Sequence, residues 1–102
     1  MRYRGKLTSS DVKTFDRRNR FKIMAEILTL CRRNLIQKTR IMYLCNLSYD
    51  QLQRYIDFLT HMGLLEAVTK SGRKYYQTTK RGIEFLEIFS KLEKFFLKNM
   101  EY

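Results

Sequence analysis

The chain has 102 residues, a net charge of +11 at pH 7 and a hydrophobic content of 44%. This length suits one domain, the hydrophobic content excludes wholesale disorder, and the charge favours an anionic partner, most often nucleic acid. No apolar run approaches the roughly 20 residues of a membrane span, and the opening MRYRGKLTSS has no apolar signal core, so we expect a cytoplasmic protein without a membrane partner.

The N-terminal residues 1–15 are predicted to form a basic arm. The first 40 residues hold 12 Lys and Arg against 3 Asp and Glu, a net +9, whereas the rest of the chain holds 9 against 7, a net +2. The candidate DNA contacts in the arm are Arg2, Arg4 and Lys6. We expect the arm to be poorly ordered without a ligand. It can follow a groove or the DNA backbone, as homeodomain arms do, or serve only as a solubilising tail.

The folded domain is predicted over residues 16–79 and begins with a helix over residues 17–33. Asp16 is suited to cap this helix. Five apolar residues recur in steps of three and four, which places them on one helical face. They are Phe21, Met24, Ile27, Leu28 and Cys31. Leu35 and Ile36 then predict a short extended segment.

Two further helices are predicted on either side of a three-residue turn. The first covers residues 38–45, the turn is Asn46-Leu47-Ser48, and the second continues to Met62. Ser48 is suited to cap the second of these helices, and Gln51 completes a capping box. The apolar face of that helix consists of Leu52, Ile56, Leu59 and Met62. Gly63 ends it as a residue that tolerates the left-handed conformation.

This pair of helices has the form of a helix-turn-helix, whose second helix enters the major groove with its N-terminal residues nearest the bases. Short polar side chains gather at that end, as base recognition requires. They are Ser48, Tyr49, Asp50, Gln51, Gln53 and Arg54. Gln53 and Arg54 are the best candidates for base contacts, because Gln can pair with adenine and Arg with guanine. The alternative interpretation is an ordinary solvated helix face.

Candidate phosphate contacts lie at the start of the helix over residues 38–45 and on a hairpin. Lys38, Thr39 and Arg40 combine cations and a hydroxyl with the free N–H groups of a helix N-terminus, a combination suited to phosphate. Residues 64–69 and 75–78 predict the two strands of the hairpin. Its tip carries Lys70, Ser71, Arg73 and Lys74, which suit phosphates or a minor groove. Simple solvation of these charges is the alternative.

The last helix is predicted over residues 80–102, capped by Thr79. Its apolar residues form two stripes, a face wider than a small domain can cover from one side. One stripe can pack on the protein's own core and the other on a second copy, so we expect a homodimer. The candidate dimer contacts are Phe85, Ile88, Phe89, Leu92, Phe95 and Phe96. The alternative is a monomer that buries all of them.

No pattern of catalytic or metal-binding residues stands out. The chain has one histidine, His61, and no carboxylate pair, Gly-rich phosphate loop or Cys/His cluster of usable spacing. We therefore expect no enzymatic activity, no metal or cofactor, and no small-molecule ligand. Cys31 and Cys45 lack CxxC spacing and are interpreted as buried thiols, while a disulfide within or between chains stays open.

The stretch KTRIMYLCNLSYDQLQRYIDFLTHMGLLE, followed by YYQTTKRGIEFLE, resembles the archaeal winged-helix DNA-binding proteins of the small basic Sulfolobus chromatin-protein type. The likeness rests on Lys38–Tyr43, the Asn-Leu-Ser turn and the Thr-Lys-Arg-Gly start of the last helix. It implies an α+β, mostly helical winged helix-turn-helix with a recognition helix from Ser48, a wing tip at Ser71 to Lys74, and a C-terminal dimerisation helix. In that family the last helix pairs as an antiparallel coiled coil, and it is shorter here.

Three functions are compatible with these features. The first is a homodimeric transcriptional regulator that binds double-stranded DNA, and the second is an architectural chromatin protein with little sequence preference. The third is a module that binds a partner protein. Related regulators and viral proteins share the domain, so the expected place of action is the nucleoid or, for a viral protein, the host-cell cytoplasm. RNA is a minor alternative, because the A-form major groove is too narrow for a recognition helix.

Overall fold

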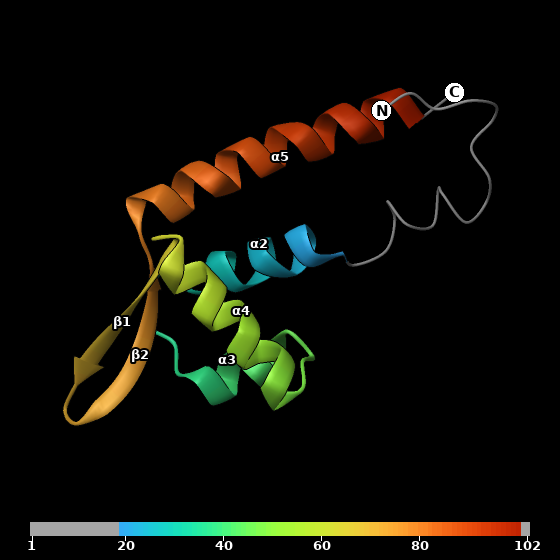
Figure 1. Ribbon diagram of the computed structural model, residues 1–102. Coiled ribbons are helices and arrows are strands. Elements are labelled where there is room, and N and C mark those ends of the chain that lie inside the picture. The colour runs from blue at the N-terminus through green and yellow to red at the C-terminus, as the bar shows by residue number, and fades with distance from the viewer. Residues whose placement is uncertain (1–18, 101–102) are drawn as a thin grey trace.

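A helical body, a projecting hairpin and a long C-terminal helix make up the fold in the computed structural model, which describes residues 19–100 (Figure 1). The elements in chain order are α2 (Arg20–Leu30), α3 (Lys38–Leu44), α4 (Tyr49–His61), β1 (Leu65–Lys70), β2 (Arg73–Thr78) and α5 (Lys80–Met100). The predicted α+β, mostly helical winged helix-turn-helix is confirmed. In the described part of the chain, no helix is long and apolar enough to cross a membrane.

Helix α2 begins later and ends earlier than predicted. Its N-cap is Asn19, whose Oδ1 accepts the backbone N–H of Lys22 at 3.0 Å, and the predicted cap Asp16 lies outside the described residues. The predicted inward position of Phe21 is wrong, since this side chain is 54% exposed. The reason is its place in the first turn of the helix, before Met24, the first residue of the core cluster.

The turn between α3 and α4 has the predicted capping box. Ser48 Oγ accepts the backbone N–H of Gln51 at 3.2 Å, and Gln51 Oε1 accepts that of Ser48 at 3.0 Å. Leu47 packs partly against the core, and Asn46 adopts a left-handed φ of 53°. Leu52, Ile56 and Leu59 are buried as predicted. Met62 is 39% exposed, so its predicted inward position is wrong, because it is the C-cap rather than part of the helix.

Strands β1 and β2 form an antiparallel hairpin in which Leu65 pairs with Thr78 and Lys70 with Arg73. The turn is shorter than predicted. It consists of Ser71 and Gly72, with φ values of 52° and 76°, as a two-residue hairpin loop that matches the strand twist requires. Arg73 and Lys74 therefore lie on β2 instead of in the turn.

Strand β2 also ties the helical body to the hairpin. The predicted extended segment forms a bridge to it, in which Ile36 and Tyr76 exchange backbone hydrogen bonds of 3.1 and 2.8 Å. The buried Thr78 donates its hydroxyl to Leu28 O at 2.7 Å and its backbone N–H to Cys31 O at 2.9 Å. The wing is therefore anchored at its base and projects freely at its tip.

The two cysteines are buried and are not joined in a disulfide, which confirms their interpretation as buried thiols. Burial, and to a smaller extent the nearby Cys45, raises the pKa of the Cys31 thiol to about 12. The Cys31 thiol therefore stays protonated at neutral pH, and a protonated thiol is a poor nucleophile.

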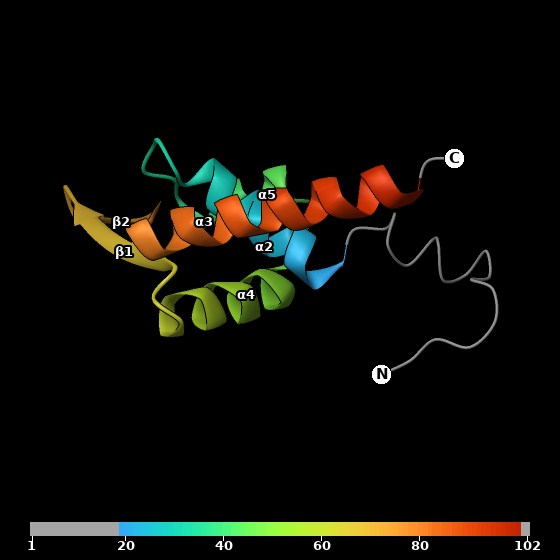
Figure 2. The same ribbon diagram turned by 90° about the horizontal axis from the view of Figure 1, so that it is seen from above.

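Helix α5 lies along α2 and reaches beyond the rest of the body (Figures 1 and 2). Thr79 caps it as predicted, because Thr79 Oγ1 accepts the backbone N–H of Gly82 at 3.1 Å. Farther along, Lys22 Nζ of α2 pairs with Glu93 at 2.6 Å. Phe85 and Leu86 pack against the core, whereas four apolar side chains of α5 are at least half exposed. These are Ile88, Leu92, Phe95 and Leu97.

Candidate nucleic-acid interface

Two of the six polar residues predicted on the recognition helix serve its N-terminus. The side chains of Ser48 and Gln51 each accept the other's backbone N–H in the capping box. Each satisfies a donor that a helix end otherwise leaves without a partner. These two side chains are exposed, but both are used to cap the first turn of α4.

Gln53 is held by its neighbours at both ends of its amide. Lys38 Nζ donates to Gln53 Oε1 at 2.5 Å, and Gln53 Nε2 donates to Asp57 Oδ1 at 2.8 Å. The side chain is half-buried between α3 and the next turn of α4. The sequence predicted Gln53 as a base contact but gave no sign of this network, because Lys38 is 15 residues away along the chain.

Tyr49 joins the same network. Lys38 Nζ lies 5.0 Å from the centroid of the Tyr49 ring and 3.4 Å from its hydroxyl. The first distance is within the range of a cation–π interaction. Tyr49 nevertheless remains 57% exposed, so its ring keeps a surface for a partner.

Asp50 and Arg54 are the exposed side chains of this end of α4 that the fold leaves unengaged. Neither makes a hydrogen bond or ion pair with any residue between 19 and 100. They are four residues apart, which places them on one face of the helix. An unengaged guanidinium presents five donors in a planar fork, the arrangement that grips the guanine edge in a major groove.

The wing presents its cations at the tip. Lys70, Ser71, Arg73 and Lys74 are all exposed. Lys70 lies directly opposite Arg73 in the strand register, and like charges at opposed positions destabilise a hairpin. An anion bound at the tip would relieve this repulsion.

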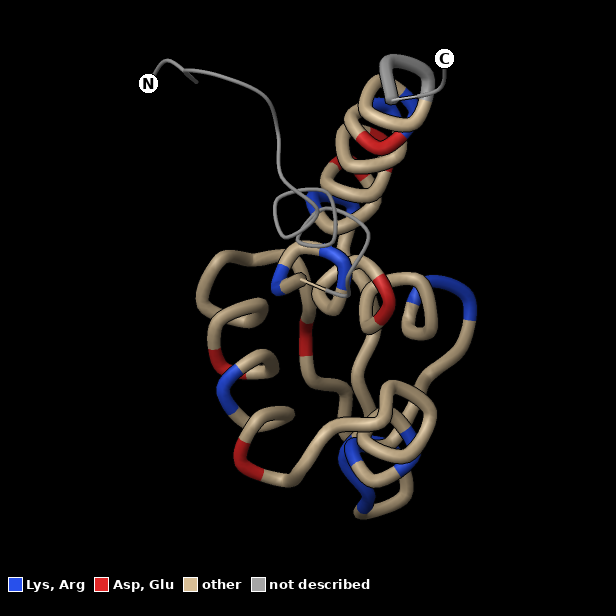
Figure 3. The backbone as a smooth tube through the Cα atoms, turned by 90° about the vertical axis from the view of Figure 1, so that its right-hand side faces the viewer, with Lys and Arg blue, Asp and Glu red and all other residues tan. Residues whose placement is uncertain are grey.

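In the part of the chain that the structure describes, a group of Lys and Arg residues lies at the end of the molecule away from α5. Figure 3 shows several Lys and Arg bands at the lower end of the view. Thr39 and Arg40, which open α3, are exposed there, whereas Lys38 is half-buried. The predicted contacts Arg2, Arg4 and Lys6 lie outside the described residues.

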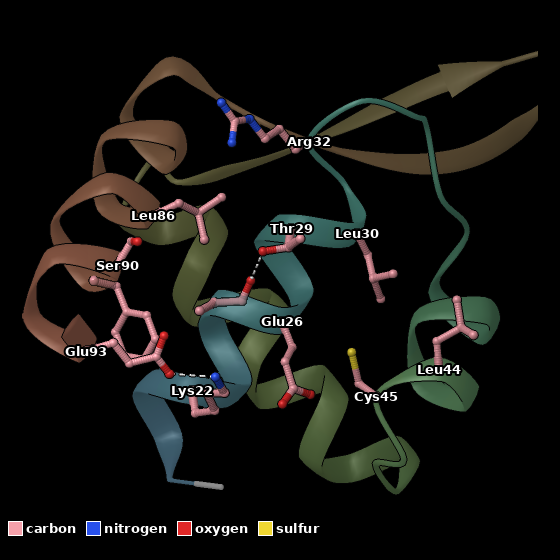
Figure 4. A pocket seen from close by; sticks show the side chains of 12 residues that line it. Lys22, Glu26, Thr29, Leu30, Arg32, Leu44, Cys45, Leu86, Ser90 and Glu93 are labelled. Carbon is pink, nitrogen blue, oxygen red and sulfur yellow. Dashed lines mark hydrogen bonds and ion pairs between the residues drawn. The ribbon is translucent and has the colours of Figure 1, made fainter. Parts of the chain in front are cut away.

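A pocket of about 500 Å³ lies between α2 and α5, with Leu44 and Cys45 on its third side. The close view in Figure 4 shows Lys22 and Glu93 meeting across it, with Leu30 and Leu86 toward its other end. Lys22 Nζ also lies 5.9 Å from the centroid of the Phe89 ring. The predicted dimer residues Phe85 and Phe89 are therefore half-buried on the inner side of α5, stacked at 6.1 Å. Among the described residues, no group of three metal-binding side chains exists.

Comparisons with known proteins agree with this architecture. A family described as winged helix-turn-helix matches residues 17–96. An uncharacterized protein of Methanocaldococcus jannaschii is 34% identical over 68 residues, which are 61% of this chain and 70% of that protein.

Solved structures give the same result. Sso10a-2, a DNA-binding protein from Sulfolobus solfataricus, matches with a TM-score of 0.66 and 29% identity over 80% of this chain and 88% of that one. MepR of Staphylococcus aureus, in complex with DNA, has a TM-score of 0.66 and 15% identity, covering 86% of this chain and 73% of that one. At that identity the second likeness shows the fold alone.

Proposed function

Because the chain belongs to the winged helix-turn-helix family, we propose that it binds double-stranded DNA as a homodimeric transcriptional regulator. One observation carries the proposal. Arg54 and Asp50 of α4 are exposed and have no partner among the described residues, on a molecule of net charge +11 whose wing tip and α3 carry further exposed cations. The proposed activity is binding without catalysis.

The proposed roles divide by chemistry. Arg54, with Tyr49 and Asp50 beside it, meets base edges in the major groove. Arg40 and Thr39 of α3 and the cations of the wing contact phosphates, which fix the position of the protein on the duplex. The wing contacts are Lys70, Arg73 and Lys74, with the Ser71 hydroxyl beside them. The likeness to Sso10a-2, described as a DNA-binding protein, supports the proposal that this chain binds DNA.

An architectural protein that coats DNA with little preference is the second candidate. It is favoured by the engagement of three recognition-helix side chains within the fold, since Ser48 and Gln51 cap α4 and Gln53 is held by two partners. Fewer side chains are then available for reading bases. Selection of bound duplexes from a random pool separates the candidates. A regulator enriches one motif, whereas an architectural protein enriches none, and failure to bind any duplex at moderate salt would favour a protein partner instead.

The proposed dimer uses the exposed side of α5. Ile88, Leu92 and Phe95 are 67%, 50% and 60% exposed and follow each other in steps of four and three, which forms one apolar stripe. Burying such a stripe against a second copy removes this surface from water, which is the main driving force of association. Phe85 and Phe89, half-buried within the protomer, contribute less to this interface than the sequence predicted.

Replacement of Phe95 by Asp is expected to convert the dimer into a monomer, because the carboxylate would be buried without a partner. Sedimentation at micromolar concentration measures this as a halving of mass from about twice the chain mass of 12.5 kDa. Lys94→Asp is the matched control, since it places the same residue on the neighbouring, polar side of α5 and should leave the dimer intact. A monomeric wild type would refute the proposed dimer.

A further inference from the structure

Lys38 differs from the two residues that follow it at the start of α3. Thr39 and Arg40 are exposed, whereas Lys38 is half-buried and directs its ammonium group toward α4. Lys38 Nζ donates to Gln53 Oε1 at 2.5 Å and lies 3.4 Å from the Tyr49 hydroxyl. An ammonium group has three donors, and the fold uses two of them on α4.

The Lys38–Gln53–Asp57 network fixes the orientation of an amide that is usually ambiguous. Lysine can only donate hydrogen bonds and an ionised carboxylate can only accept them. The Gln53 oxygen must therefore face Lys38, and the Gln53 nitrogen must face Asp57, 2.8 Å away. A flipped amide would set donor against donor at one end and acceptor against acceptor at the other.

The fixed amide still has capacity for a base. Its oxygen keeps one lone pair and its nitrogen keeps one N–H, since each atom offers two sites and the fold uses one. Bidentate pairing with adenine requires one acceptor and one donor from glutamine, so the remaining sites suffice. A side chain already held in one geometry loses less conformational entropy on binding than a free one.

We propose that Lys38 is a positioning residue for base recognition, which together with Asp57 holds the Gln53 amide and the Tyr49 ring in the geometry that α4 presents to DNA, and that it is not a phosphate contact. This inference rests on the proposed binding of double-stranded DNA. It assigns Lys38 a role opposite to the one that its sequence position predicts. Arg40, exposed and two residues away, keeps the phosphate role.

Salt dependence distinguishes the two roles. Loss of one phosphate contact lowers the slope of log affinity against log salt by about 1 and weakens binding to all sequences alike. Arg40→Met should show this behaviour. Lys38→Met should leave the slope within about half a unit of wild type and reduce the preference for the selected duplex over random duplex by about tenfold. Lys94→Met, which removes a charge on α5, controls for net charge.

Two further variants protect the test against a folding defect in Lys38→Met. Asp57→Ala removes the other anchor of Gln53 together with a negative charge, so simple electrostatics predicts tighter binding. Electrostatics alone would leave the preference for the selected duplex unchanged, whereas the positioning role predicts that this preference falls about tenfold. In a cycle with Gln53→Ala, Lys38→Met should have a smaller effect on preference than in the wild type, because the Gln53 amide is already gone and only the Tyr49 ring is left to position.

The possible results distinguish the positioning role, base recognition and DNA binding from one another. A slope reduced by about 1 in Lys38→Met, or additive effects of Lys38→Met and Gln53→Ala, would overturn the positioning role and restore the phosphate contact. A wild type that binds duplex without preference would overturn base recognition but leave DNA binding intact. A wild type that binds no duplex would overturn the proposed function itself.

Discussion

Replacement of Gly82 by alanine is expected to destabilise the fold by about 3 kcal/mol, at the upper end of the cost of overpacking a core site. A Cβ at this position would lie 2.3 Å from Leu64 O and 2.5 Å from Thr78 Cγ2. Both atoms are closer than any van der Waals contact allows. Helix propensity alone predicts the opposite sign, because alanine is favoured over glycine inside a helix by about 1 kcal/mol.

At Gly82 the steric clash outweighs the gain in helix propensity, because neither Leu64 O nor the Thr78 side chain can move without losing a hydrogen bond. Leu64 O accepts the backbone N–H of Thr79 at 3.1 Å, which joins the end of α4 to the start of α5. The Thr78 side chain is buried, and its hydroxyl is bound to Leu28 O. Any shift that makes room for a methyl group therefore breaks a hydrogen bond where the wing, α4 and α5 meet.

Urea denaturation of Gly82→Ala and Gly72→Ala measures this difference. Gly72 has a φ of 76° and no atom within 4 Å of an added Cβ, so alanine there costs only the backbone strain of about 1–2 kcal/mol. Gly82→Ala should have the lower free energy of unfolding of the two variants. Equal or reversed values would show that the start of α5 can slide away from Leu64.

Local signals in the sequence predicted the helix ends that short-range hydrogen bonds determine. Ser48 with Gln51, Gly63 and Thr79 each act within a few residues, and all three features occur as predicted. Prediction failed where tertiary contacts decide the outcome. The apolar period of α2 placed Phe21 inward, but no element within residues 19–100 covers the first turn of that helix sufficiently to bury it.

In the candidate interface too, local sequence signals predicted some features, and tertiary contacts determine the others. Its location on α4 and the wing could be predicted from polar residues after a cap and cations at a turn. The engagement of Gln53 could not, because it depends on the distance between side chains 15 residues apart. The pocket between α2 and α5 likewise combines three elements and leaves no pattern in the sequence.

Affinity for duplex DNA is expected to fall by about 10³-fold or more between about 50 and 200 mM salt. Each phosphate neutralised releases counterions, which contributes a slope of about −0.9 to log affinity against log salt, and a fall of this size requires six or more such contacts. Within residues 19–100, one protomer supplies four exposed cations at positions proposed to meet phosphate. They are Arg40, Lys70, Arg73 and Lys74.

The number of contacts links the salt slope to the oligomeric state. If Lys38 is occupied within the protein, the four exposed cations from the described part of one protomer fall short of six, whereas the same residues of two protomers bound to one duplex provide eight. The monomeric variant Phe95→Asp should therefore show about half the wild-type slope, and Lys94→Asp should retain the full slope. Fluorescence anisotropy of a labelled duplex across the salt range measures both. A flat dependence in the wild type would contradict the electrostatic interface. If the Phe95→Asp monomer kept the steep salt dependence of the wild type, the phosphate contacts beyond these four residues would belong to the same protomer.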